Sequence, residues 1–206
     1  MHRHRTPRFL ATVSFATLTF ALGAEVALAD TTVSGNSTTP VLTSTGGNVT
    51  VASGGTITLV NGSAVTVDSS NTATVASGGT IAMGAGNGAT GITVNPGTST
   101  TISNAGAINV TENYTAPFIT NNGVNIADGP IAAASNRYGI HVLSGGTVTG
   151  SVTNSGTISV EGLNSAGIAL DSTLNGNLAN TGTISVKGDN SAGIRTSAVT
   201  GNVTVG

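Results

Sequence analysis

The 206-residue chain contains no cysteine and no tryptophan, only 7% of its residues are charged, and its formal net charge is −2. Without cysteine there is neither a disulfide framework nor a zinc–thiolate site, and without an excess of positive charge a basic nucleic-acid binder is excluded. Aromatic residues make up only 3% of the chain. A compact globule of this size usually fills its core with aromatic residues and leucine, so a narrow interior built from smaller side chains is favoured.

Small polar residues dominate the composition instead. Thr (35), Gly (30), Ser (21) and Asn (20) together supply 106 residues. Leu, Ile, Val and Phe contribute a further 49, and the net charge is close to zero, so the composition does not match that of a disordered chain. Because Thr, Val and Ile are abundant and β-branched residues favour extended strands, the composition predicts an all-β protein.

The N-terminal segment, residues 1–29, has the three parts of a secretory signal peptide. Three arginines lie within residues 1–8, an uncharged and mostly apolar stretch of 15 follows at residues 9–23, and Ala27-Leu28-Ala29 forms a small-x-small cleavage pattern. The apolar stretch is short for a transmembrane helix, and the arginines are separated, so no twin-arginine signal is present. We therefore predict a cleavable leader at 1–29 and a mature region at 30–206.

Internal repeats are the clearest feature of the mature region. Residues 154–168 (NSGTISVEGLNSAGI) and 180–194 (NTGTISVKGDNSAGI) match at 12 of 15 positions with an offset of 26. The heptapeptide VASGGTI occurs at 51–57 and again at 75–81, an offset of 24. Repeats of this length indicate a solenoid before any single globular domain is considered.

The repeats contain short strand-like runs separated by Gly- and Asn-rich turns, with no capped helical pattern after residue 30. Near-identical segments at a fixed offset can stack on themselves as like-on-like ladders, which favours a parallel β-helix over hairpins. We predict a right-handed parallel β-helix of about seven turns, the hand following from the general crossover preference. Residues 111–135 break the pattern and are predicted to form an irregular turn or a loop excursion. The residues expected to point inward are Ile57, Val65, Val75, Ile81, Ile158, Val160, Ile168, Ile184, Val186 and Ile194, with Asn stacked on Asn at turns and Thr and Ser outside.

Three motifs resemble known chemistry, and each has a simpler interpretation. Residues 86–91 spell G-x-G-x-x-G, but a strand pattern follows where a dinucleotide site needs a helix. His141 is the only histidine after the leader, and alternation places it on the outer face of a strand. Lys187-Gly188-Asp189 matches an integrin-binding tripeptide but falls at a repeat turn.

The carboxylates of the mature region are scattered singly along the sequence, unlike the clustered acids of polysaccharide-cleaving β-helices. Stacking would bring Glu161 and Lys187 together as a surface pair, because they lie 26 residues apart. We therefore assign no catalytic, cofactor-binding or metal-binding residue and expect no cofactor and no enzymatic activity.

The signal peptide, the NSGTISV and NSAGI repeats and the VASGGTI elements together resemble the N-terminal part of an autotransporter passenger domain from a Gram-negative bacterium. The resemblance covers essentially the whole chain. It implies export through the inner membrane, followed by display on the outer membrane or release. It also implies a C-terminal outer-membrane barrel, whose aromatic girdles are absent from this sequence; we therefore expect residues 30–206 to be part of a passenger domain, either as a fragment of a longer chain or as a truncated gene product.

The leading functional hypothesis is a non-enzymatic passenger stalk that contributes to adhesion or cell–cell contact by binding a protein or glycan on another surface. A β-helical enzyme acting on polysaccharide is the first alternative. The second is a flat Thr array that binds ice or another ordered surface, but the matches Thr56/Thr58 and Thr98/Thr100 are not in register. No nucleic-acid partner is expected.

Overall fold

The computed structural model describes residues 28–206. The signal peptide predicted at residues 1–29 therefore lies almost entirely outside the described residues. Between residues 28 and 206 no helix has the length and apolar character needed to cross a membrane.

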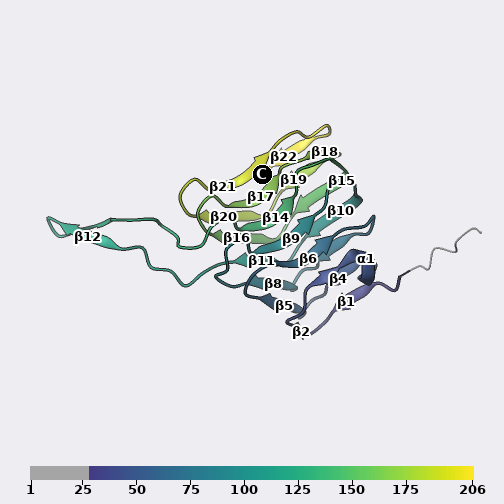
Figure 1. Cartoon of the computed structure of the whole chain (residues 1–206), viewed down its shortest axis with the longest axis horizontal. Helices are drawn as coiled ribbons and strands as arrows, with labels where there is room; N and C mark the ends of the chain where they lie inside the picture. Colours follow the sequence, from purple (N-terminus) through teal and green to yellow (C-terminus); the bar gives the residue numbers. More distant parts are fainter. Residues whose placement is uncertain (1–27) are drawn as a thin grey trace, which may run out of the picture.

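The chain winds through three parallel sheets that form the sides of a rod, and successive coils stack in sequence order from one end to the other (Figure 1). Sheet A comprises β1 (Thr31–Val33), β4 (Val49–Val51), β7 (Ala73–Val75), β10 (Ser99–Asn104), β15 (Thr147–Asn154), β19 (Leu178–Asn180) and β22 (Val203–Val205), and β18 (Thr173–Asn175) also pairs with β15. Sheet B comprises β2 (Asn36–Ser37), β5 (Thr56–Leu59), β8 (Thr80–Met83), β11 (Ala107–Val110), β16 (Thr157–Glu161) and β20 (Thr183–Lys187). Sheet C comprises β3 (Val41–Leu42), β6 (Ser63–Val67), β9 (Thr90–Val94), β14 (Tyr138–Val142), β17 (Ala166–Leu170) and β21 (Ala192–Thr196). This is a parallel β-helix, as the repeats predict, and within residues 28–206 the one short helix, α1 (Thr43–Gly46), is a single turn between coils.

The sequence repeats set the register of the stacking. In sheet B, β16 pairs with β20 so that Ile158 lies beside Ile184 and Val160 beside Val186, each 26 residues apart. The VASGGTI copies stack in the same way at a separation of 24, with Ile57 beside Ile81. The seven successive strands of sheet A agree with the predicted seven turns.

Ladders of aliphatic side chains fill the narrow interior between the three sheets. Of the ten residues predicted to point inward, seven are fully buried and the other three, in the last coils, are partly buried against the same core. The partly buried members are Ile184, Val186 and Ile194. Because each coil covers only its neighbours, a residue in a terminal coil packs on one side only.

Three asparagines occupy equivalent inward positions on successive strands of sheet A; we call a row of such register-paired residues a file. Asn104, Asn154 and Asn180 stack on one another, with Asn104 Nδ2 donating to Asn154 Oδ1 at 2.7 Å and Asn154 Nδ2 donating to Asn180 Oδ1 at 2.7 Å. The predicted Asn ladder therefore exists, but its side chains are at most 5% exposed and belong to the core. In the preceding coil the same file holds Val75, which leaves Asn104 Oδ1 without a hydrogen-bond partner.

The turn that leads into sheet C explains the Asn of the NSAGI repeat. In successive coils this turn contains a residue with positive φ, supplied first by Gly and then by Asn. Glycine adopts this conformation without steric cost, and Asn tolerates it better than most residues. The residues are Gly62, Gly88, Asn136, Asn164 and Asn190.

The Gly of the same repeat allows sheet C to approach sheet B closely. A Cβ added at Gly167 would lie 2.7 Å from the carbonyl oxygen of Gly193 and would also collide with Ile184 Cγ2. Gly91 and Gly139 occupy the equivalent position in earlier coils and meet Ile108 and Ile158 in the same way. Glycine is therefore required in the middle of this Ala-Gly-Ile sequence, because any side chain at that position would collide with sheet B and with the neighbouring strand of sheet C.

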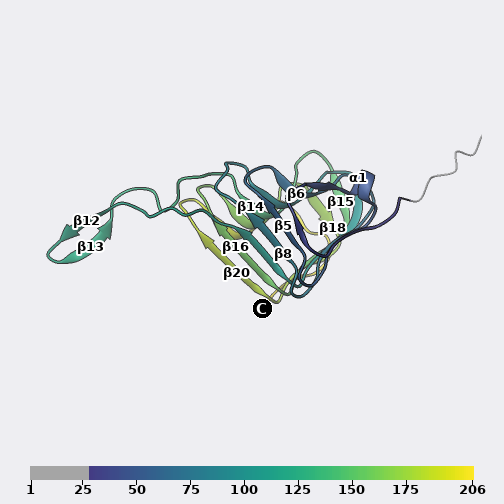
Figure 2. The same cartoon turned by 90° about the horizontal axis from the view of Figure 1, so that it is seen from below.

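Residues 111–135, predicted as a loop excursion, form an arm that projects from the side of the rod (Figures 1 and 2). Its far part is an antiparallel hairpin of β12 (Phe118–Asn121) and β13 (Val124–Ala127). Asn122 and Gly123 connect the strands, both with positive φ, which is the geometry of a two-residue hairpin turn. The arm also makes one coil long: Ile102 of sheet A pairs with Val152, 50 residues later.

Candidate functional site

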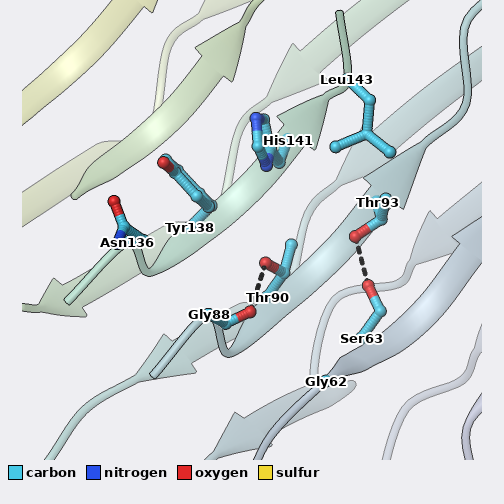
Figure 3. Close-up of a pocket in the computed structure, with 9 residues that line it drawn as sticks. All are labelled: Gly62, Ser63, Gly88, Thr90, Thr93, Asn136, Tyr138, His141 and Leu143. Carbon is cyan, nitrogen blue, oxygen red and sulfur yellow. Dashed lines mark hydrogen bonds between the residues drawn. The ribbon is translucent and has the colours of Figure 1, made fainter. Parts of the chain in front are cut away.

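The outer face of sheet C carries a shallow depression of about 460 Å³ where the arm rejoins the rod (Figure 3). Small residues of β6, β9 and the turns before them form its floor, and larger residues from β14 and its flanks form its wall. The lining residues are Gly62, Ser63, Gly88, Thr90, Thr93, Asn136, Tyr138, His141 and Leu143.

The register of sheet C creates this depression. One outward file runs Ser63, Thr90, Tyr138, Ala166, Ala192, and the next runs Thr66, Thr93, His141, Ala169, Arg195. Tyr138 and His141 thus stand side by side in the two files, with hydroxyl residues on one side and, on the other, the alanines of the next strand. Tyr138 and His141 form a ridge. The depression is the hollow on the side of that ridge where β6 and β9 carry hydroxyl residues.

The two rings of the ridge support each other. Their centroids are 3.9 Å apart with an interplanar angle of 34°, and Figure 3 shows the side chains side by side on the outer face. Tyr138 is only 9% exposed. On the floor of the depression, the hydroxyls of Ser63 and Thr93 share a hydrogen bond.

The charged pair Asp171–Arg195 holds His141 in place from the side of the ridge where the alanines lie. His141 Nε2 lies 2.8 Å from Asp171 Oδ2, and Arg195 Nη2 lies 3.0 Å from Asp171 Oδ1. Partial burial acts to raise the pKa of Asp171, but hydrogen bonds from His141 and Arg195, and then their charges, outweigh it and hold the pKa below its ordinary value. The arginine also sits over the Tyr138 ring, 5.7 Å from the ring centroid. His141 is therefore the outward strand residue that alternation predicts, with its ring oriented by a carboxylate.

A second cluster, at the base of the arm, anchors the excursion to the rod. Arg137 is fully buried, and its guanidinium donates to the backbone carbonyls of Gly84, Thr111 and Glu161. Burial lowers the pKa of Arg137, and the nearby carboxylates Glu112 and Glu161 oppose that shift. The coils before and after the arm and its departing limb are thereby joined through one side chain.

The carboxylates in this cluster are occupied by structural hydrogen bonds. Glu112 accepts from the backbone N–H of Ala133 at 2.6 Å and of Ala134 at 2.9 Å, which closes the base of the arm. Glu161 accepts from Lys187 at 2.6 Å, the pair predicted from the repeat offset, although Glu161 is 9% exposed and not on the open surface. Two acids that are far apart in the sequence are thus brought near each other, with Glu161 Oε2 accepting from the Glu112 backbone N–H at 3.1 Å, but each carboxylate also accepts from other donors.

The other candidate motifs take structural roles. Residues 86–91 form the turn into β9 and contain no helix, so the geometry of a dinucleotide site is absent. Lys187-Gly188-Asp189 lies at a turn after β20, where Asp189 accepts from the backbone N–H of Ile131 at 3.3 Å. Among residues 28–206 no group of three or more His, Asp or Glu side chains could hold a metal ion.

Sheet A presents a file of hydroxyl side chains on its outer face. The paired residues of successive coils are Thr32, Thr50, Thr74, Ser103, Thr153, Ala179 and Thr204. Thr56 and Thr100 lie in different sheets, as expected from their lack of register. The hydroxyl file was not found in the sequence because Ser replaces Thr in one coil and the offset varies between coils.

No family model matches the chain, and neither a curated protein nor a solved structure matches it.

Proposed function

We propose that this protein is an exported, non-enzymatic passenger stalk of the autotransporter type, which presents contact surfaces for adhesion or cell–cell contact. The observation that carries the proposal is a rod of stacked coils with an arm projecting from its side. Such a rod holds its surfaces away from an attachment point. The signal-peptide pattern and the repeat sequences support export, and the fold is one that passenger domains share.

The projecting arm is the first contact surface. Cross-strand pairing places Ile119, Ile126 and Val124 on one face of the hairpin, and they are 50%, 45% and 62% exposed. An isolated two-stranded hairpin is only marginally stable in water, and residues 113–127 contain no charged side chain. Exposed apolar side chains on a projecting element are typical of interaction sites.

The absence of cysteine from the chain allows a direct test of surface presentation. Cysteine replaces Asn122 at the exposed hairpin turn in one variant and the fully buried Ala64 in a matched control. In cells that carry the gene in its natural context, a membrane-impermeant maleimide should label Asn122→Cys on intact cells and leave Ala64→Cys unlabelled. Labelling of Asn122→Cys only after the cells are permeabilised would refute surface presentation.

Adhesion is tested separately with the apolar face of the arm. Replacing Ile119 and Val124 together by Ser removes apolar contact area without altering buried residues of the rod. The variant should reach the surface in normal amount and reduce cell aggregation or attachment. Unchanged aggregation at equal surface amount would exclude the arm as the contact element.

The hydroxyl file of sheet A favours a second candidate function, the binding of an ordered surface such as ice. Strands repeat about every 4.8 Å in a sheet, so the file is a regular row of hydroxyls, interrupted at Ala179. Inhibition of ice recrystallisation by the purified chain, lost on Thr74→Tyr, would support this candidate. Recrystallisation at the rate seen with an inert protein would exclude it.

A further inference from the structure

We propose that the depression on sheet C binds an uncharged oligosaccharide. The inference deepens the proposed function and rests on it, because an adhesive stalk requires a ligand on the opposing surface. It concerns a site on the rod itself and is independent of the projecting arm.

The lining of the depression matches a ligand that is rich in hydroxyl groups. Ser63 and Thr93 offer hydroxyls, and Asn136 offers an amide; each of these groups can both donate and accept hydrogen bonds. The Thr90 hydroxyl already donates to the backbone carbonyl of Gly88 at 3.2 Å, so it can only accept from a ligand. None of the nine lining residues carries a permanent charge. An ionic ligand would therefore find no counter-charge in the lining, whereas a neutral sugar would find a partner for several of its hydroxyls.

The polar groups of the depression retain hydrogen-bonding capacity. Ser63 and Thr93 share one hydrogen bond between their hydroxyls, and the Ser63 hydroxyl also donates to the backbone carbonyl of Val65 at 3.5 Å, which leaves acceptor lone pairs available to a ligand. His141 uses Nε2 for Asp171, and within residues 28–206 its Nδ1 has no protein partner. The ring is nevertheless held in place by Tyr138 and Asp171, so little side-chain entropy is lost when a ligand binds.

The charged residues of this region lie behind the ridge and outside the depression. Arg195 belongs to the same file as His141 but two strands further along, beyond Ala169. It is engaged with Asp171 and the Tyr138 ring. The charges thus position the ridge, and the surface offered to the ligand stays neutral.

The volume and openness of the site fit a small part of a longer glycan. About 460 Å³ is within the range of small-molecule sites, but a depression on a sheet surface leaves much of a ligand in water. We expect weak binding at one site, and avidity when many stalks engage one polysaccharide.

The test uses the purified chain and four immobilised neutral probes: cellohexaose, maltohexaose, mannohexaose and chitohexaose, with a sulfated heparin hexasaccharide as the charged control. The expected result is saturable binding to at least one neutral probe and none to the sulfated one. Thr93→Val, which removes a hydroxyl and keeps the β-branched shape, should weaken binding about five-fold or more. Thr153→Val makes the same change on the outer face of sheet A and should leave binding unchanged.

Binding to no neutral probe, or binding that Thr93→Val and Thr153→Val weaken equally, would overturn the proposal. Preferential binding of the sulfated probe would also overturn it. Failure here is distinguishable from failure of the proposed function: if Asn122→Cys is labelled on intact cells and no neutral probe binds, surface presentation stands and the sugar site falls. If a neutral probe binds and Asn122→Cys is not labelled on intact cells, the sugar site is supported and surface presentation is refuted.

Discussion

The buried asparagine ladder of sheet A yields a prediction in which one substitution is more damaging than three. Asn154 is the middle member: it accepts one hydrogen bond and donates another, both at 2.7 Å. Replacing it with Val removes both bonds and leaves Asn180 Oδ1 buried without this donor, whereas Asn104 Nδ2 retains Thr157 O at 3.2 Å. The same file holds the buried Val75 in the preceding coil, so the file accommodates the shape of valine.

The loss of unfolding free energy in Asn154→Val can be estimated from the hydrogen bonds it removes and the acceptor it leaves unsatisfied. Each lost hydrogen bond costs about 1 kcal/mol net, and a buried acceptor left unsatisfied costs about 1–3 kcal/mol. Allowing for the apolar surface that valine buries, Asn154→Val should lower the free energy of unfolding by about 2–4 kcal/mol. For a chain of this size the midpoint of thermal unfolding should fall by roughly 5–15 °C.

The triple variant Asn104→Val/Asn154→Val/Asn180→Val removes both amide–amide hydrogen bonds together with their partners. Of the other acceptors of the ladder, the carbonyls of Thr157 and Gly182 lose a side-chain donor, but both residues are reached by solvent. Replacing both members of a buried polar pair by apolar groups can be nearly neutral, and Asn104 Oδ1, which has no partner, disappears as well. Its free energy of unfolding should therefore lie within about 1 kcal/mol of the native value. Urea unfolding followed by circular dichroism measures both variants. A triple variant as unstable as the sum of the three single variants would refute the reasoning.

Three further predictions concern packing, the partly exposed Lys187–Glu161 ion pair and acid stability. Gly167→Ala should destabilise the fold, because its Cβ would meet backbone and Ile184, whereas Gly35→Ala, which has open space around it, should be tolerated; thermal unfolding of the two variants compares them, and equal midpoints would contradict the packing. Lys187→Ala should lower the free energy of unfolding by about 1 kcal/mol in urea titration, since the Lys187 side chain is 52% exposed and the Glu161 carboxylate, 12% exposed, keeps the Glu112 backbone N–H as a donor; a loss of several kcal/mol would mean that Glu161 is left as an unpaired buried charge. Because the folded-state pKa of Asp171 lies below its unfolded value, its contribution is complete above the unfolded pKa and is lost as the pH falls through the folded one, below about pH 4. Asp171 faces His141 and Arg195, and Asp171→Asn should flatten the decline in stability below pH 4 measured by urea titration; an unaltered decline would assign it to other carboxylates.

The fold was predictable because its repeats are nearly identical where they stack. Ile158 and Ile184, or Ile57 and Ile81, occupy matching positions in the sequence and adjacent rungs in the rod. A fixed offset is sufficient to infer parallel register in such segments, and the short polar turns exclude helical connections. The arm was predicted only as an excursion, although Asn122-Gly123 is a hairpin signal that could have identified its shape.

The candidate site was not predictable, because it depends on offsets that the repeats do not share. His141 lies beside Thr93, 48 residues earlier, since the arm lengthens that coil. Its partner Asp171 is 30 residues later and follows the end of a strand. The burial of Arg137 contradicts the usual preference of arginine for the surface, and only the carbonyl groups gathered at the base of the arm explain it.

The stacking of repeats in parallel register, on which the fold and every surface described above depend, can be measured with paired pyrene labels. Ser159 and Ser185 are outward neighbours in sheet B, whereas Thr58 lies in the same file four strands from Ser185. Adjacent strands are about 4.8 Å apart and the four-strand separation is roughly 19 Å. Because the chain lacks cysteine, Ser159→Cys/Ser185→Cys labelled with pyrene maleimide should show strong excimer emission and Thr58→Cys/Ser185→Cys should show none. Absent excimer emission in the first variant, or equal emission in both, would contradict the stacked parallel β-helix.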